Sequence, residues 1–260
     1  MNADMSGRTA VITGGASGIG ETICRLLAAH GAMVVVADRD DTKAAALASE
    51  LSGSSVSVDV TSQESVAEAA ERIETDTGPV DTLITSAGVT QPPLPPEELE
   101  QATWDAVLNV DLRGTWLSAT AFGHRMAVRG RGSIVTIASI AGMRSMPLHA
   151  YTPAKAGVIA MTSDLAAEWG RSGVRVNSVS PGYTLTPLLQ DQIDRGHRDT
   201  TNLTSESALG KLVQTNEVAQ AVHFLCSDNA SGITGINLPV DAGWLATAPW
   251  HTYGGIRDKR

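Results

Sequence analysis

Tyr151 and Lys155 lie four residues apart in the segment Tyr151-Thr-Pro-Ala-Lys155, and Ser139 precedes the tyrosine by twelve residues. In a helix, a spacing of four places two side chains on one face, where an ammonium can stabilise a phenolate. One positive charge roughly 4–5 Å away, at an effective dielectric constant of about 20, contributes about 3–4 kcal/mol. Ionising a phenol near neutral pH costs about 4 kcal/mol. The pair therefore predicts a tyrosine that works as an acid or base.

A glycine-rich turn between a strand and a helix lies near the N-terminus. Residues 9–13 form a short apolar pattern, Gly14-Gly-Ala-Ser-Gly18-Ile-Gly20 follows it, and an amphipathic pattern continues over 21–30. This order suits a pyrophosphate, which binds to glycine backbone at the positive end of a helix. A second apolar run, 32–37, ends at Asp38, whose carboxylate is placed to accept hydrogen bonds from an adenosine ribose. These features predict a dinucleotide-binding site.

Together these residues resemble the short-chain dehydrogenase/reductase family, and the resemblance covers nearly the whole chain. The glycine motif of the family, Thr-Gly-x-x-x-Gly-x-Gly, matches Thr13 to Gly20. Its catalytic residues fall on Asn109, Ser139, Tyr151 and Lys155. The resemblance implies reversible hydride transfer between a secondary alcohol, or a ketone, and a nicotinamide.

Each of the four residues has an expected role within this resemblance. Tyr151 removes the hydroxyl proton, and Ser139 donates a hydrogen bond to the substrate oxygen. Lys155 stabilises the ionised tyrosine and hydrogen-bonds the nicotinamide ribose. Asn109 interrupts its helix, so that a backbone carbonyl binds a water that links Lys155 to solvent.

The resemblance also supplies the cofactor contacts. They come from the glycine turn, from the ends of the second, third, fourth and sixth strands, and from the catalytic pair. The expected cofactor-binding residues are Gly14, Ser17, Gly18, Ile19, Gly20, Asp38, Asp59, Val60, Ala87, Gly88, Tyr151, Lys155, Pro181, Gly182, Thr184 and Thr186. The negative charge of Asp38 favours NAD over NADP, as does Ser17, a position where relatives that prefer the phosphate often carry a basic residue. Arg39 is the contrary feature, because an arginine beside this site can pair with a phosphate.

The chain departs from the family pattern in two places. Thr85-Ser86-Ala87-Gly88 stands where the family commonly has Asn-Asn-Ala-Gly, which puts the bracing hydrogen bond of the first Asn in doubt at Thr85. Pro153 separates the catalytic pair, and proline is tolerated only in the first turn of a helix. Tyr151 and Pro153 are therefore expected at the very start of their helix.

The substrate is less constrained by the sequence. His149 is either a substrate contact or a loop residue, Arg144 is either an anion-binding residue or a solvated one, and Tyr183 is placed to wall the pocket. Segment 185–212 either forms a substrate lid or contributes its apolar residues to ordinary helix packing. Residues 181–187 are similar to segments of family members that oxidise sugar alcohols and other polyols, so a polyol is the favoured substrate. The alternatives are a 3-ketoacyl reductase and a non-catalytic dinucleotide-binding sensor.

Alternating apolar strand patterns and helical patterns fill the chain and predict one doubly wound, Rossmann-type parallel α/β sheet of about seven strands, in a single domain over 1–260. The strand patterns are 9–13, 32–37, 54–60, 80–85, 132–138, 173–179 and 236–240. The helical patterns are 18–30, 41–51, 62–77, 97–128, 150–170 and 215–227. Ligands of such a sheet bind at the carboxyl ends of its strands.

Composition restricts the partners and the compartment. A net charge of −9 and a pI of about 5.1 argue against nucleic acid and anionic membranes. No leader or membrane-spanning pattern is visible, and Cys24 and Cys226 are too few for a disulfide framework. The six histidines are scattered, so no metal site is expected. We expect a cytoplasmic enzyme acting on a small molecule.

Two helical patterns, 97–128 and 150–170, are richer in apolar residues than one-sided packing on a sheet requires. Their apolar residues include Ala119, Ala121, Phe122 and Met126 in the first, and Ala160, Met161, Leu165 and Trp169 in the second. In the family that the chain resembles, these helices form a subunit contact, commonly within a tetramer. A homotetramer is therefore expected. The C-terminal tail, about 244–260, is expected to pack either across a subunit boundary or on its own subunit.

Overall fold

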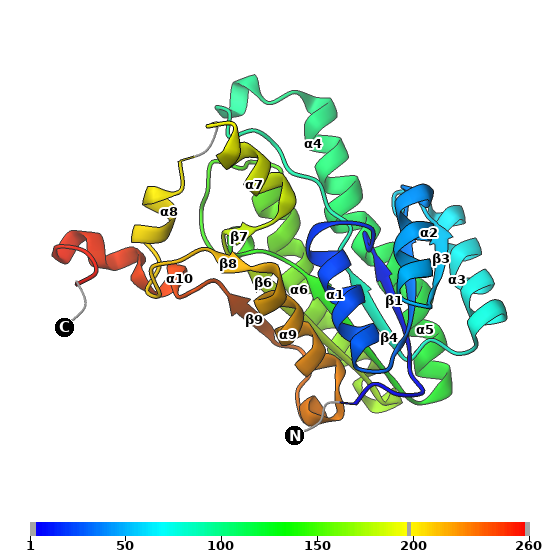
Figure 1. The fold of residues 1–260 in the computed structure, drawn as a ribbon. Helices are drawn as coiled ribbons and strands as arrows, with labels where there is room; N and C mark the ends of the chain where they lie inside the picture. Colours follow the sequence, from blue (N-terminus) through cyan, green and yellow to red (C-terminus); the bar gives the residue numbers. More distant parts are fainter. Residues whose placement is uncertain (1–3, 197–198, 258–260) are drawn as a thin grey trace.

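A seven-stranded parallel sheet forms the centre of the protein (Figure 1). The structure, a computed structural model, describes residues 4–196 and 199–257. The strand order is β3-β2-β1-β4-β5-β6-β9, which confirms the doubly wound sheet. Its strands are β1 (Thr9–Thr13), β2 (Met33–Asp38), β3 (Ser54–Ser57), β4 (Thr82–Thr85), β5 (Gly132–Ile137), β6 (Val174–Pro181) and β9 (Asn237–Val240).

Helices cover both faces of this sheet, and each layer has its own apolar core. The longer helices are α1 (Gly18–Ala29), α2 (Asp41–Glu50), α3 (Gln63–Thr77), α4 (Gln101–Val107), α5 (Gly114–Arg129), α6 (Tyr151–Trp169) and α9 (Thr215–Cys226). One core joins α1, α2 and α9 to the sheet, and the other joins α3, α5 and α6 to it. Because both faces are covered, β1, β4, β5 and β6 are buried at nearly every position.

The edge strand β3 is shorter than the predicted run, which extended to residue 60. As an edge strand it pairs only with β2. Beyond its end, the Val58 N–H still donates to the Asp38 carbonyl at 3.0 Å. The Asp59 carboxylate then accepts from the Thr61 N–H at 2.9 Å, and this turn redirects the chain toward α3. Asp59 and Val60 therefore lie in a turn beyond the end of the strand.

The predicted helix 97–128 is interrupted in the structure. A short 3₁₀ turn, η1 (Pro96–Glu98), precedes α4, and a π-helical turn, η2 (Leu108–Arg113), separates α4 from α5. The Gly114 N–H bonds the Asn109 carbonyl, five residues back. Such a turn inserts one residue into the helix and rotates the side chains that follow, and π-turns are frequent at functional sites.

Several short elements connect the end of β6 to the C-terminus, and strand and helix periodicity did not predict them because they are too short. They are β7 (Thr184–Leu185), α7 (Pro187–Asp194), α8 (Thr201–Ser205), β8 (Val213–Gln214), α10 (Trp244–Thr247) and η6 (Ala248–Tyr253). In Figure 1, α10 and the segment after it extend away from the body of the molecule. Within the described ranges, no helix is long and apolar enough to cross a membrane.

Candidate active site

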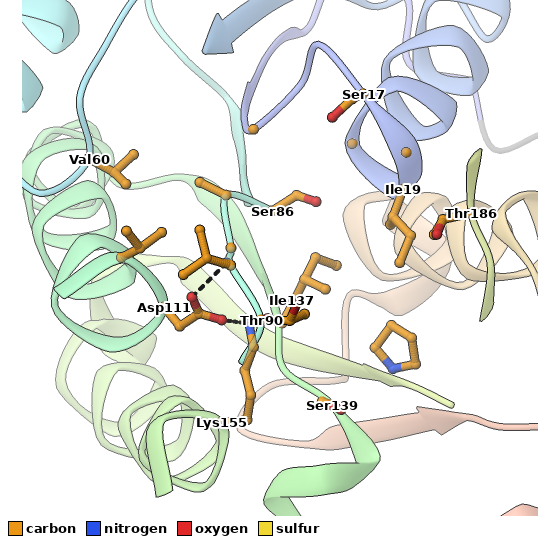
Figure 2. A pocket seen from close by; sticks show the side chains of 18 of the residues that line it. Ser17, Ile19, Val60, Ser86, Thr90, Asp111, Ile137, Ser139, Lys155 and Thr186 are labelled. Atoms are coloured by element: carbon orange, nitrogen blue, oxygen red, sulfur yellow. Dashed lines mark hydrogen bonds and ion pairs between the residues drawn. The ribbon is translucent and has the colours of Figure 1, made fainter. Parts of the chain in front are cut away.

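A cavity of about 730 Å³ opens at the carboxyl ends of the central strands (Figure 2). Its wall combines the turn between β1 and α1 with the ends of β2, β4, β5 and β6. Every residue predicted to bind the cofactor lines it, and so do Ser139 and Tyr183. A parallel sheet brings these segments together because all its strands end at the same edge.

The glycine turn forms one wall through close backbone approaches. Gly14 has φ +66°, and a Cβ on it would lie 2.6 Å from Cα of Ala87. A Cβ on Gly20 would lie 2.1 Å from the Gly14 carbonyl oxygen. Side chains are therefore excluded at both positions, and α1 starts at Gly18 with its N-terminus at the cavity. This arrangement suits an anionic group such as a pyrophosphate.

The Asp38 carboxylate is held in place where β2 ends. One of its oxygens accepts from the Ala16 N–H at 3.0 Å, and the other accepts from the Asp40 N–H at 3.0 Å. Asp38 and the neighbouring Arg39 both line the cavity. A fixed carboxylate here can accept hydrogen bonds from ribose hydroxyls and repels a phosphate.

Tyr151 is the first residue of α6, and Pro153 lies in the first turn, as expected. The N-terminus of this helix is capped by Gln91, whose role the sequence analysis missed. The Gln91 side-chain oxygen accepts from the N–H groups of Ala150 at 2.6 Å and Tyr151 at 3.0 Å. Gln91 is itself buried, in the proline-rich segment after β4. It therefore ties the start of α6 to the edge of the sheet.

Lys155 is buried one turn after Tyr151. Its ammonium donates to the Ile137 carbonyl at 2.9 Å and lies 5.4 Å from the centroid of the Tyr151 ring. Burial disfavours the ammonium, but Tyr151 and Asp111 outweigh this effect and raise the pKa of Lys155 above its usual value. The spacing of four therefore produces the expected neighbourhood of an ammonium and a phenol.

Asn109 lies apart from the other three predicted catalytic residues, and its expected role through a backbone carbonyl stays a prediction. Asn109 is exposed and does not line the cavity, although the predicted interruption of its helix is present at η2. Asp111, two residues later, is fully buried, lines the cavity and lies 3.2 Å from the Lys155 ammonium. Figure 2 shows the two side chains meeting.

A sequence signal for Asp111 existed. Val107, Asp111 and Thr115 are spaced by four, so they share one helical face, and all three are buried. Asn109 lies two residues from Asp111 and therefore on another face. A lone acidic residue on an apolar face requires a partner in the interior.

The two predicted substrate residues have different positions. Tyr183 lines the cavity, and its ring packs edge-on against Trp244 with centroids 5.5 Å apart. Arg144 lies over the same indole at 5.8 Å. His149 is half-buried and does not line the cavity. In the predicted lid segment, Thr186 and Leu189 line the cavity.

The departure at the end of β4 has a structural consequence. The hydroxyl of Thr85 is buried and has no hydrogen-bond partner among the residues the structure describes. The bracing bond expected from an asparagine in the family pattern is thus not made by Thr85. Ser86, the next residue, lines the cavity.

Comparison with known proteins identifies the family of this chain. A family model described as enoyl-(acyl carrier protein) reductase matches residues 14–245. The cis-4-hydroxycyclohexanecarboxylate dehydrogenase of Sinomonas cyclohexanicum is 38% identical, over 92% of this chain and 97% of that protein. The D-threitol dehydrogenase of Mycolicibacterium smegmatis is also 38% identical, over 92% and 94%. The chain belongs to the short-chain dehydrogenase/reductase family.

Solved structures share the fold over nearly the whole chain. A Brucella melitensis 16M structure described as ribose-5-phosphate isomerase has a TM-score of 0.96 and 51% identity, covering 99% of this chain and 100% of that one. A gluconate 5-dehydrogenase from Burkholderia cenocepacia J2315, in complex with NADP and tartrate, has a TM-score of 0.89 and 31% identity, covering 94% and 98%. The chain is an oxidoreductase of this family, which binds nicotinamide dinucleotides.

Replacing Gln91 tests the cap on α6. Gln91→Ala leaves two N–H groups at the start of the helix without their acceptor, which is expected to lower the free energy of unfolding by about 1–3 kcal/mol. Gln101→Ala is the matched control, because the Gln101 side chain is exposed and donates to Asp105 on the helix surface. Its expected effect is about 0.5 kcal/mol or less. Chemical denaturation measures both, and equal losses would contradict the capping role.

Proposed function

We propose that the protein is an NAD-dependent dehydrogenase that interconverts a secondary alcohol and a ketone. The observation that carries this proposal is one cavity that contains both a dinucleotide wall and Ser139, Tyr151 and Lys155. The side-chain-free backbone at Gly14 and Gly20 and the fixed carboxylate of Asp38 fit a nicotinamide dinucleotide. When bound, that group supplies the acceptor or donor of hydride.

The residues of the chain supply placement and proton transfer. Ser139, at the end of β5, donates a hydrogen bond to the substrate oxygen and orients it toward Tyr151. Tyr151 takes the hydroxyl proton during oxidation and returns it during reduction. The Lys155 ammonium, 5.4 Å from the ring centroid, stabilises the phenolate that Tyr151 uses as a base. The residues of the chain thus accelerate the reaction by positioning and electrostatics.

A sugar alcohol or another polyol is the proposed substrate class. Support comes from the D-threitol dehydrogenase relative and from the similarity of residues 181–187 to polyol-oxidising family members. A 3-ketoacyl reductase is the alternative, and the acyl-carrier description of the family model favours it. The isomerase description of the Brucella structure is a further possibility to test, but a dinucleotide wall has no purpose in an aldose–ketose isomerisation.

Activity on a substrate panel tests the proposed chemistry. Protein and oxidised cofactor are mixed with polyols, cyclic alcohols and 3-hydroxyacyl thioesters, and reduced nicotinamide is followed by absorbance; ribose 5-phosphate is assayed separately for isomerisation. With the best substrate, Tyr151→Phe is expected to lower turnover by about 10²–10⁴ while cofactor affinity is kept. Near-wild-type turnover of a folded variant would refute the role of Tyr151. Cofactor binding without turnover of any alcohol would favour the sensor alternative.

Cofactor preference follows from the charge of Asp38. A 2′-phosphate beside this carboxylate suffers repulsion and displaces the ribose hydrogen bonds, so kcat/KM is expected to be at least about 10-fold higher with NAD than with NADP. Asp38→Asn is expected to lower the ratio of kcat/KM with NAD to kcat/KM with NADP. Asp41→Asn, an exposed change of equal charge on α2, is the control and keeps it. A wild-type preference for NADP would contradict the assignment of NAD as cofactor. Arg39 would then be the residue expected to pair with the 2′-phosphate.

A homo-oligomer, with a tetramer favoured, is also proposed. Ala119, Phe122, Met126 and Leu165 are buried within the subunit, so they do not support this proposal as the sequence suggested. Its support is the exposed Trp116 on α5, the exposed Trp250 and the family resemblance. A mass of four chains by light scattering at micromolar concentration is the expected result, and a monomeric mass would contradict it. Deleting 249–260 tests whether the tail contributes.

The free, buried thiols of Cys24 and Cys226 agree with a proposed cytoplasmic location. Burial raises the pKa of both thiols to about 12, so neither is placed to act as a nucleophile.

A further inference from the structure

A buried pair of one acidic and one basic residue, Asp111 and Lys155, lies next to Tyr151. The proposed function assigns a role to Lys155 but none to Asp111. Asp111, on η2, and Lys155, on α6, approach each other to 3.2 Å between Oδ2 and Nζ. Their side chains are 0% and 5% exposed. A carboxylate buried to this degree is costly unless paired, so its presence beside the lysine calls for a function or a compensating contact.

The position of Asp111 is determined by backbone contacts as well as by Lys155. Its other oxygen, Oδ1, accepts from the Val89 N–H at 2.9 Å, which ties η2 to the segment after β4. Gly88 leaves room for the pair, because a Cβ there would lie 3.3 Å from Asp111 Oδ2 and 3.7 Å from the Lys155 nitrogen. Figure 2 shows the Asp111 carboxylate beside the Lys155 ammonium. The carboxylate is therefore a built part of the cavity wall.

Lys155 serves two groups at once. Its ammonium is 3.2 Å from the Asp111 carboxylate and 5.4 Å from the centroid of the Tyr151 ring. When Tyr151 ionises beside the Asp111–Lys155 pair, the site gains a net negative charge. If residue 111 were neutral, the same ionisation would leave the site neutral, which costs less in a poorly solvated cavity.

The titration of the pair is consistent with mutual stabilisation. Burial raises the pKa of the Asp111 carboxyl, and the Lys155 ammonium opposes that rise. On Lys155, burial opposes the charge, but Tyr151 and Asp111 outweigh it and the pKa of the ammonium is raised. The lysine thus stays protonated over the range in which Tyr151 must change its proton.

We propose that the Asp111 carboxylate offsets part of the charge of the Lys155 ammonium, which the Ile137 carbonyl also holds in place, so that Asp111 sets the pH at which Tyr151 becomes a base. The kinetic consequence rests on the proposed function, since it needs a substrate. The spectroscopic consequence, a shift in tyrosinate formation, needs neither substrate nor turnover.

Other ionisable groups near the pair are far along their elements or directed elsewhere. Asp105, on α4, is exposed and accepts from Gln101, and Arg113 donates to the Thr61 carbonyl. On α5 and α6, the other ionisable residues begin at His124 and Asp164, more than two helical turns from Gly114 and Lys155. The remaining charged residues that line the cavity are Asp38, Arg39 and Asp59, which the proposed function places around the adenosine end.

Ultraviolet difference titration tests the proposal directly. The chain has three tyrosines, so subtracting the titration of Tyr151→Phe isolates the tyrosinate signal of Tyr151. Asp111→Asn keeps the size of the side chain and an oxygen that can accept from Val89, but removes the charge. Its tyrosinate midpoint is expected about one pH unit or more below that of the wild type. The acidic limb of the kcat/KM profile for alcohol oxidation is expected to move to lower pH by a similar amount.

Asp105→Asn is the matched control. It removes the same charge from an exposed carboxylate six residues away, where solvent screens it. Its tyrosinate midpoint is expected to stay within about 0.2 pH unit of the wild type. A shift in Asp111→Asn alone therefore reports the buried pair and not a general change in net charge.

An unchanged or higher midpoint in folded Asp111→Asn would overturn the proposal. If that variant does not fold, Asp111→Ser takes its place with the same expected direction. If neither variant folds, the infrared spectrum of the wild type decides. A protonated buried carboxyl band that persists above neutral pH means that Asp111 has no negative charge with which to offset Lys155, and it would overturn the proposal. A midpoint shift without activity on any alcohol would support the role of Asp111 and refute the dehydrogenase.

Discussion

The parallel direction of all seven strands is the constraint on which the rest of the molecule depends. Because β1, β2, β4, β5 and β6 all end at one edge, the loops that follow them meet around a single cavity. Segments more than a hundred residues apart in the chain thereby form one wall. The strands are buried under helices on both faces, so this edge is where polar and charged side chains can gather without disturbing the core.

The cavity wall combines two kinds of contact that have opposite requirements. At Gly14 and Gly20, backbone approaches backbone so closely that a side chain is excluded, and the N-terminus of α1 lies at the cavity. At Asp111 and Lys155, two charged side chains are withdrawn from water, so their mutual attraction must compensate for part of the lost hydration. The first contact suits recognition of an anion, and the second sets the charge balance around Tyr151.

Of the predicted catalytic residues, Ser139, Tyr151 and Lys155 line one cavity, and Asn109 does not. The Tyr-x-x-x-Lys spacing works locally, since two residues on adjacent turns of α6 are neighbours whatever surrounds the helix. Asn109 was selected by residue type, but it is exposed and does not line the cavity. Asp111 lies in the π-turn η2 and meets Lys155. Helical periodicity indicates Asp111 as an acidic residue on an apolar face, but it does not identify Lys155 as the partner.

By itself, the sequence determined the order and nearly all the boundaries of the sheet strands and main helices, the glycine turn and the spacing of Tyr151 and Lys155. These features depend on local periodicity and on backbone freedom, which neighbouring residues encode. Only the tertiary structure decided that Gln91 caps α6, that His149 lies outside the cavity and that Asp111 meets Lys155. Each of these contacts joins segments distant in the chain, so it depends on the packing of α4, η2 and α6 at the sheet edge and not on any local pattern.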